Sequence, residues 1–178
     1  MTNRQQWTLV AGVVMTALFG VALAIKLRPQ LNLLEVGSTA PDFKAVELPG
    51  GRPATIENYR GKVVLLNIWA TWCPPCKVEM PSMERLHQKL AGTDFQLVAV
   101  SVDEEDSSVV NKFVHEYGLT FPVLHDQDGS IRQIYQTTGV PESFVIDRDG
   151  VIVKKVIGAA DWDAPVNENL IRRLLDAR

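Results

Sequence analysis

The chain contains two cysteines, Cys73 and Cys76, separated by two prolines in the stretch Trp72-Cys73-Pro74-Pro75-Cys76. Thiols at this spacing can form a disulfide, be reduced again, and exchange with the disulfide of another molecule. A bridge that closes so short a loop restrains the unfolded chain little, and the disulfide frameworks of secreted domains use more cysteines. The pair is therefore expected to carry redox chemistry and not to stabilise the fold.

The residues around the pair predict that it lies where a buried strand meets a helix. Residues 62–70 are nearly all apolar, as in a strand covered on both faces, and apolar side chains recur at helical spacing after the pair. At a helix N-terminus, unpaired main-chain N–H groups would favour the thiolate of Cys73 and make it the exposed nucleophile. Cys76 would be more buried and would resolve the mixed disulfide. Pro74 suits the first helical turn, and Pro75 stiffens the loop.

Other chemistry for a Cys-x-x-Cys pair lacks the residues it needs. A structural zinc site requires further cysteine or histidine ligands at suitable spacing, and His87, His115 and His125 are isolated. Each histidine is expected to be a surface or half-buried residue. Covalent haem attachment needs a histidine directly after the second cysteine, where this chain has Lys77. No metal and no cofactor are therefore expected.

The rest of the chain alternates predicted strands and helices. Residues 40–48 favour a strand, a turn follows at 49–53, and a return strand is expected to begin at 54–56. The acidic run at 103–106 is expected to cap a helix and not to bind metal. Further strands are expected at 95–102, 121–124, 143–147 and 151–156, and further helices at 109–117, 131–135 and 164–175. This order predicts an α/β domain with a mixed sheet and helices on both faces.

The N-terminal part is a candidate membrane segment. Residues 7–25 carry no charge, and a run of about 19 mostly apolar residues is long enough to cross a bilayer as a helix. Residues 22–24 also resemble a cleavage site, but the apolar part of a cleaved signal usually has about 7–15 residues, which favours a retained anchor. After Arg28 the chain has 15 basic and 21 acidic residues, which argues against nucleic-acid binding.

The motif Trp-Ala-Thr-Trp-Cys-Pro-Pro-Cys-Lys at 69–77, with Pro81 and the block Gly-Val-Pro-Glu-Ser-Phe-Val-Ile-Asp at 139–147, resembles the thioredoxin superfamily. In particular, the chain is similar over essentially its whole length to the membrane-anchored TlpA, ResA and CcmG proteins of bacteria. The resemblance implies a thioredoxin-like mixed central sheet flanked by helices. It also implies an N-terminal hairpin, a strand–helix insertion and one preceding transmembrane helix.

The resemblance further implies where a partner protein binds. Pro141 would be cis and face the sulfurs, Val140 would offer main-chain groups to the partner, and Trp72 would lie beside the same groove. Glu142, directly after the cis-proline position, is similar to a residue of CcmG and is expected to line this groove. Pro81 resembles the proline that kinks the active-site helix in this superfamily.

Two positions differ from cytosolic thioredoxin. Thioredoxins keep a buried aspartate six residues before the first cysteine, where this chain has Asn67. Glu79 lies three residues after Cys76, on the same helix face, and matches a glutamate that tunes the thiols of ResA-type proteins. A partly buried carboxylate there would have a raised pKa and could exchange protons with Cys76. An ordinary exposed helix glutamate is the alternative.

In function, the resemblance implies reduction of the haem-binding cysteines of apocytochrome c, with electrons from a membrane thiol transporter of the CcdA or DsbD type. The Pro-Pro dipeptide lacks the histidine of strongly oxidising Cys-Pro-His-Cys proteins, which favours a reductant of partner disulfides. The alternatives are a general extracytoplasmic disulfide reductase or isomerase, a peroxidase and a non-catalytic holdase. Peroxiredoxins have proline and threonine seven and three residues before the reactive cysteine, where this chain has Leu66 and Ala70.

The resemblance and the apolar segment together predict the layout of the chain. Residues 1–28 would form a membrane anchor or signal segment, residues 29–38 a linker, and residues 39–178 a thioredoxin-like domain. We expect a single-pass protein of the bacterial cytoplasmic membrane, with its catalytic domain on the extracytoplasmic, periplasmic side.

Overall fold

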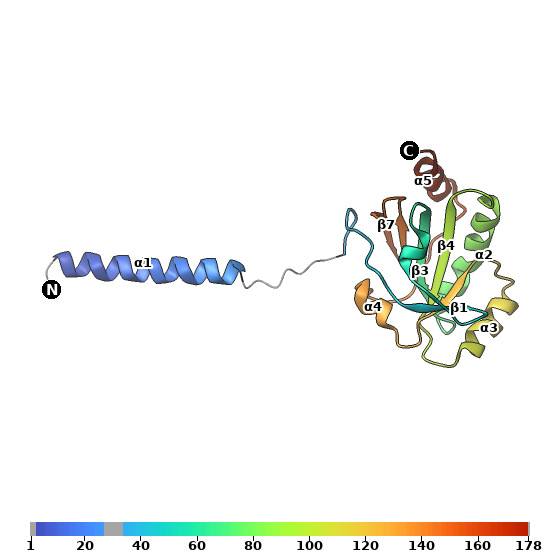
Figure 1. The fold of residues 1–178 in the computed structure, drawn as a ribbon, viewed down its shortest axis with the longest axis horizontal. Helices are drawn as coiled ribbons and strands as arrows, with labels where there is room; N and C mark the ends of the chain where they lie inside the picture. Colours follow the sequence, from blue (N-terminus) through green and yellow to red (C-terminus); the bar gives the residue numbers. More distant parts are fainter. Residues whose placement is uncertain (1–2, 27–33, 178) are drawn as a thin grey trace. The chain divides into compact units, whose positions relative to one another are not determined.

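A computed structural model describes residues 3–26 and 34–177, and the chain forms two compact units, Met1–Leu33 and Leu34–Arg178 (Figure 1). In the first unit, helix α1 spans Asn3–Lys26, and its stretch Gln5–Leu23 is long and apolar enough to cross a membrane. A secretory signal sequence meets the same criterion. Residues 27–33 lie outside the described residues, and they include positions 29–33 of the predicted linker.

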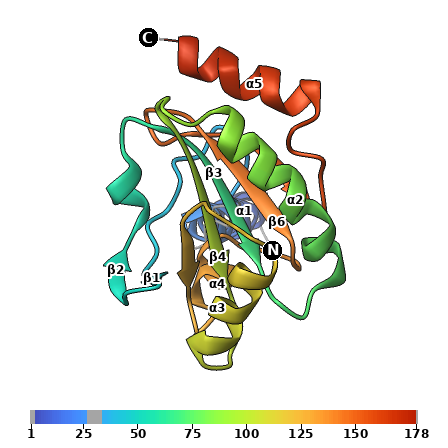
Figure 2. The same ribbon diagram turned by 90° about the vertical axis from the view of Figure 1, so that its right-hand side faces the viewer.

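The second unit is built on a seven-stranded mixed sheet in the order β2-β1-β5-β4-β3-β6-β7 (Figure 2). Strands β3, β4 and β5 are parallel, and the other neighbours pair antiparallel. The strands are β1 Ala45–Leu48, β2 Arg52–Ala54, β3 Val63–Trp69, β4 Phe95–Ser101, β5 Val123–His125, β6 Glu142–Ile146 and β7 Ile152–Ile157. The thioredoxin-like mixed sheet expected from the sequence is confirmed.

Helices pack against this sheet around one apolar core. They are the 3-10 turn η1 at Ile56–Tyr59, α2 at Pro74–Lys89, α3 at Ser107–Glu116, α4 at Ser130–Ile134 and α5 at Pro165–Asp176. Helix α2 contacts β4, α3 contacts β5 and α5 contacts β3. Every residue of β3 is buried, as its nearly continuous apolar sequence predicts for a strand at the centre of a sheet. The Met80, Met83, Leu86 and Leu90 face of α2 is also buried.

The N-terminal hairpin is present but shorter than predicted. Strand β1 occupies only the second half of the predicted strand at 40–48. The return strand β2 ends at Ala54, because the next residues enter η1, where the Asp42 carboxylate accepts the Ile56 N–H at 3.1 Å. β2 is an edge strand, where Pro53 can be accommodated without the loss of a ladder hydrogen bond.

Residues 34–38, expected to be linker, are fastened to the domain. Their main-chain groups bond along the outer hairpin, with the Gly37 N–H donating to the Ile152 carbonyl at 2.8 Å and the Ile152 N–H donating to the Ser38 carbonyl at 2.9 Å. Thr39 forms an isolated antiparallel bridge with Val151. The folded unit therefore begins several residues before position 39.

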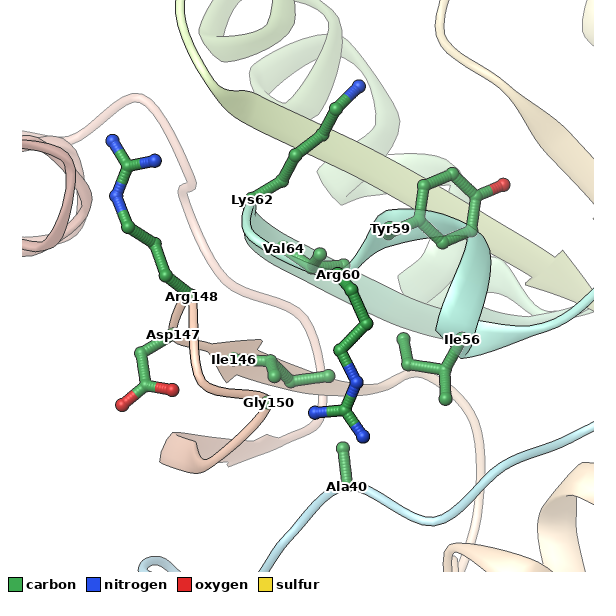
Figure 3. A pocket seen from close by; sticks show the side chains of 10 residues that line it. All are labelled: Ala40, Ile56, Tyr59, Arg60, Lys62, Val64, Ile146, Asp147, Arg148 and Gly150. Carbon is green, nitrogen blue, oxygen red and sulfur yellow. The ribbon is translucent and has the colours of Figure 1, made fainter.

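Arg60 and Gly150 are in tight contact (Figure 3). Arg60 precedes the start of β3, whereas the cysteines follow its end. The Arg60 guanidinium lies beside Gly150, and its Nη1 donates to the Asp149 carbonyl at 2.9 Å. Gly150 has φ +82°, and a Cβ built on it would overlap Nη1 of Arg60. A side chain at position 150 would therefore meet both backbone strain and a steric clash.

Replacing Gly150 with alanine is expected to destabilise the fold more than a matched glycine replacement. The left-handed backbone costs about 1–2 kcal/mol for a residue with a Cβ, and displacing Arg60 removes a hydrogen bond worth about 0.5–1.5 kcal/mol. Gly118 has φ +59° with nothing within 4 Å of its ideal Cβ, so Gly118→Ala measures the backbone strain alone. Urea unfolding of both variants gives the difference, and equal losses would show that Arg60 moves aside at no cost.

Candidate functional site

Cys73 and Cys76 form a disulfide at the junction of β3 and α2, where the sequence placed them. Cys73 is the N-cap residue of α2, and Pro74 and Pro75 occupy the first helical positions. Because a proline has no N–H, the first main-chain donor of the helix is the N–H of Cys76. That N–H points at the Sγ of Cys73, 3.2 Å away. The helix thus directs its first hydrogen-bond donor at a single sulfur.

The expectation that Cys73 is exposed is wrong for this oxidised state. Cys73 is 2% exposed and Cys76 has no exposed surface. The sulfur of Cys73 is covered because the carbonyl oxygen of Val140 lies 3.5 Å from it. The Val140–Pro141 peptide bond is cis, as the resemblance implied, and Pro141 is buried. Trp72 is 56% exposed and presents its indole to solvent next to the disulfide in the sequence.

Glu79 is buried inside the domain at 1% exposure, which excludes the alternative of a surface helix glutamate. Its Oε1 accepts the Nδ2–H of Asn67 at 2.8 Å, and its Oε2 accepts the Ala160 N–H at 3.2 Å and the Trp162 indole N–H at 3.3 Å. Burial raises the pKa of Glu79 to about 7, although these three hydrogen bonds oppose the shift. The carboxyl group can therefore gain or lose a proton near neutral pH.

A loop after β7 separates this carboxyl group from solvent. Trp162 has no exposed surface, and its main-chain N–H donates to the Ser82 hydroxyl at 3.0 Å. Ion pairs hold the same region to α2, with 2.7 Å between Arg85 Nε and Asp163 Oδ2 and 3.1 Å between Lys89 Nζ and Glu168 Oε2. The sequence reasoning missed this contribution because the loop lies about 80 residues after Glu79.

Asn67 joins the buried acid to the strand that follows the cis-proline. Its Nδ2 donates both to Glu79 and to the Ser143 hydroxyl, each at 2.8 Å. Asn67 and Ser143 are also partners in the β3–β6 register. The Oδ1 of Asn67 has no hydrogen-bond partner. If the side-chain amide rotated by half a turn, this oxygen could accept a hydrogen bond from a donor at position 79. One amide therefore links α2, β3 and β6.

Glu142 does not line an open groove, which corrects the expectation of direct contact with a partner. It has no exposed surface, because it begins β6 between β3 and β7. Its Oε1 lies 2.8 Å from Nζ of Lys155 without hydrogen-bond alignment, and its Oε2 accepts the Thr138 N–H at 3.2 Å. The side chain instead holds the loop that leads into the cis-proline.

The acidic run at 103–106 divides into two roles. Asp106 caps α3 as predicted, since its carboxylate accepts the Ser108 N–H at 2.9 Å. Asp103 is fully buried and accepts hydrogen bonds from Thr71 and Ser101, a contact that the sequence reasoning missed. His125 also differs from the expectation of a surface or half-buried residue, because it is 4% exposed and its Nε2 lies 2.8 Å from the Asp103 carbonyl oxygen.

The chain is similar to known thiol–disulfide oxidoreductases. Residues 36–155 match the model of the AhpC/TSA family. Thiol-disulfide oxidoreductase ResA of Bacillus cereus (strain ATCC 10987 / NRS 248) is 34% identical over 156 residues, covering 88% of this chain and 89% of that protein. A thioredoxin family thiol:disulfide interchange protein from Chlorobium tepidum TLS is 27% identical with a TM-score of 0.66, covering 79% of this chain and 98% of that one.

The fold alone is also shared with the thioredoxin domain of a thiol-disulfide oxidoreductase from Bacteroides vulgatus. That domain has a TM-score of 0.70 at 23% identity and covers 80% of this chain and 99% of its own. The chain belongs to the AhpC/TSA family. Within it, the Cys-x-x-Cys disulfide and the similarity to ResA define a thiol–disulfide oxidoreductase.

Proposed function

We propose that this protein reduces the disulfides of partner proteins, with Cys73 as the attacking thiol and Cys76 as the resolving thiol. The observation that carries the proposal is the 3.2 Å contact between the Cys76 N–H and the sulfur of Cys73. A hydrogen bond donated to the charged form of an acid lowers its pKa. The reduced Cys73 would therefore be the more acidic thiol of the pair, and the thiolate is the nucleophile in disulfide exchange.

The reaction proceeds in two exchanges. The Cys73 thiolate attacks one sulfur of the partner disulfide, which forms a mixed disulfide and releases the other partner sulfur as a thiolate. The Cys76 thiolate then attacks the Sγ of Cys73, which restores the observed disulfide and releases the second partner thiolate. The partner gains two electrons from the cysteine pair, and its two thiolates take up protons.

We further propose that Glu79 exchanges a proton with Cys76 during the second step. Cys76 must lose its proton before it can attack, and Glu79 follows it by three residues on the same helix. A general base works best when its pKa lies near the operating pH, and burial raises the pKa of Glu79 to about 7. Trp72, Val140 and Pro141 would bind the partner chain, and Pro74 and Pro75 would stiffen the loop.

The substrate proposal comes from the resemblance to TlpA, ResA and CcmG proteins. It names the haem-binding cysteines of apocytochrome c as the substrate and a membrane thiol transporter of the CcdA or DsbD type as the electron donor. The helix α1 supports a single membrane anchor within residues 1–28, because its stretch Gln5–Leu23 is long and apolar enough to cross a bilayer. The placement of the domain of residues 39–178 on the extracytoplasmic side comes from the resemblance alone. A general reductase or isomerase would use the same chemistry on a broader set of proteins.

One experiment compares these possibilities. The reduced protein is mixed separately with an oxidised Cys-x-x-Cys-His peptide, with insulin and with hydrogen peroxide, and the oxidation of its own thiols is followed. We expect fast reaction with the peptide, slower reaction with insulin and little with peroxide. Equal rates with peptide and insulin would indicate a general reductase. No reaction with either disulfide would contradict the proposed function and leave a holdase role.

The low expected rate with peroxide has a structural reason. Ala70 occupies the position where a peroxiredoxin has its threonine, and it has no hydroxyl to offer. The neighbouring Thr71 does have a hydroxyl, but that group donates to the Asp103 carboxylate.

The reduction potential of the same preparation tests the proposed direction of exchange. A value near that of DsbA, about −120 mV, would contradict the proposal that the protein is a reductant.

A further inference from the structure

Asp103 is tied to the loop that leads into the redox pair. Its carboxylate accepts the main-chain N–H of Thr71 at 3.0 Å to Oδ2 and 3.2 Å to Oδ1. The Thr71 hydroxyl donates to Oδ1 at 2.5 Å. Only Trp72 separates Thr71 from Cys73 in the sequence. The Asp103 side chain therefore holds a residue two positions before the attacking sulfur.

The other contacts of Asp103 fix it to the centre of the sheet. The Ser101 hydroxyl, at the end of β4, donates to Oδ2 at 2.6 Å and accepts the Asp103 N–H at 3.2 Å. The Asp103 carbonyl oxygen lies 2.8 Å from Nε2 of His125, at the end of β5. The Val102 N–H also donates to the Trp69 carbonyl at 2.9 Å. Asp103 therefore connects the ends of β4 and β5 to the loop after β3.

We propose that Asp103 is a positioning residue for thiol–disulfide exchange, holding Thr71 so that Cys73 stays at the N-cap of α2, facing the Cys76 N–H. This inference rests on the proposed attack by Cys73. A buried carboxylate is costly unless it is hydrogen-bonded, and three of the donors to this one are supplied by Thr71 and Ser101. Hydrogen bonds to a charged acceptor are roughly twice as strong as neutral ones, so a carboxylate is well suited to hold Thr71 in place.

The test measures the pKa of the Cys73 thiol in the full-length chain, solubilised in detergent and carrying Cys76→Ser so that a single thiol reacts. Iodoacetamide alkylation is followed against pH with and without Asp103→Asn. We expect the variant to raise the pKa by about one unit, because a loosened Cys73 loses part of its hydrogen bond from the main-chain N–H of residue 76. Loss of a negative charge alone would lower the pKa instead, so a lowered or unchanged pKa overturns the proposal.

The same change has a kinetic consequence in the chain that retains Cys76. At a pH more than one unit below the wild-type pKa of Cys73, a rise of one unit makes the thiolate about tenfold scarcer, while each thiolate becomes roughly threefold more nucleophilic. We therefore expect reduction of an oxidised peptide to slow by about threefold in Asp103→Asn. Addition of Thr71→Val should then slow it little further, because both changes act through one contact.

Matched variants separate positioning from lost stability. Asp126 is a second buried aspartate, whose carboxylate accepts the Ile131 N–H at 2.7 Å at the start of α4. Asp126→Asn should weaken the fold and leave the pKa of Cys73 unchanged. Thr71→Ser keeps the hydroxyl and should behave as wild type, whereas Thr71→Val should raise the pKa even if Asp103→Asn fails to fold. An equal pKa in Thr71→Ser and Thr71→Val overturns the proposal.

These measurements also distinguish failure of this inference from failure of the proposed function. Alkylation of Cys73 requires no partner protein, so it reports on the Asp103–Thr71 contact even if the wild-type protein reduces no protein disulfide. Conversely, a wild-type protein that reduces disulfides, with a Cys73 pKa indifferent to Asp103 and Thr71, would keep the function and reject the positioning role.

Discussion

Replacing Cys76 with serine is expected to abolish repeated turnover and to leave the protein covalently joined to its partners through Cys73. The first exchange needs only the Cys73 thiolate, whose hydrogen bond from the main-chain N–H of residue 76 survives a side-chain change. The second exchange needs the Cys76 sulfur, which a serine hydroxyl cannot replace because it forms no disulfide. Expressed in its native host, the variant should yield mixed disulfides on non-reducing gels.

The identity of the trapped partners tests the substrate proposal. Recovery of apocytochromes would support a role in cytochrome maturation, whereas a broad mixture would indicate general reduction or isomerisation. Cys73→Ser is the matched control, because it removes the attacking sulfur and should give no adducts. Adducts formed equally by both variants would mean that either cysteine attacks, contrary to the roles proposed for the pair.

Replacing Glu79 with glutamine is expected to remove a pH dependence of stability that amounts to about 2–3 kcal/mol between pH 5 and pH 8. The pKa of Glu79 is raised to about 7 in the folded protein from an ordinary value of 4.5. The folded state therefore binds this proton more tightly than the unfolded chain does. The resulting stability is fully present below pH 4.5 and is lost as the pH rises through about 7.

The glutamine variant should thus be the more stable form at pH 8 and nearly equal to the wild type at pH 5. The site can accept the change, because Asn67 can turn its unpartnered Oδ1 toward the new amide N–H. Urea unfolding of the oxidised protein at several pH values measures the difference. A constant difference at all pH values would show that Glu79 does not titrate near neutrality.

Glu84→Gln on the same helix provides a control of opposite sign. Partial burial raises the pKa of Glu84, but hydrogen bonds from Thr120 and Gln88, together with the nearby charge of His87, outweigh it and leave the pKa lowered. Stability from this group is present above its unfolded pKa and is lost as the pH falls through the folded one. The control variant should therefore be less stable than the wild type at neutral pH. If the rate of disulfide reduction is measured against pH, only Glu79→Gln should lose the change in rate near pH 7 that titration of Glu79 causes.

Much of the fold follows from local sequence patterns, because burial and hydrogen bonding act there on neighbouring residues. The apolar run that forms β3 and the helical spacing in α2 place Cys73 at a strand–helix junction without knowledge of the tertiary structure. The return strand at 54–56 was predicted wrongly, since a side-chain contact from Asp42 favours the turn η1 there. Short elements depend more on such single contacts than long ones do.

The site was predictable to the extent that its residues are close in sequence. Cys76 and Glu79 share a helix face, and that spacing, together with the resemblance to ResA-type proteins, suggested their relation. The burial of Glu79 depends on Trp162, and the hold on Thr71 depends on Asp103, which lie about 80 and about 30 residues away. No local pattern marks such contacts. The covering of Cys73 by Val140 was likewise outside the reach of spacing arguments.

The loop that shields Glu79 gives the C-terminal end of the chain a role in the chemistry of a distant motif. Ala160 and Trp162 cover the Glu79 carboxyl group and donate hydrogen bonds to it. Ion pairs from Arg85 to Asp163 and from Lys89 to Glu168 hold the following residues against α2. Truncation of α5, a bulky C-terminal tag or high salt would therefore admit water to the carboxyl group. A protein preparation altered at the C-terminus can therefore show a shifted pH dependence of the redox site, although Glu79 lies far from that end in the sequence.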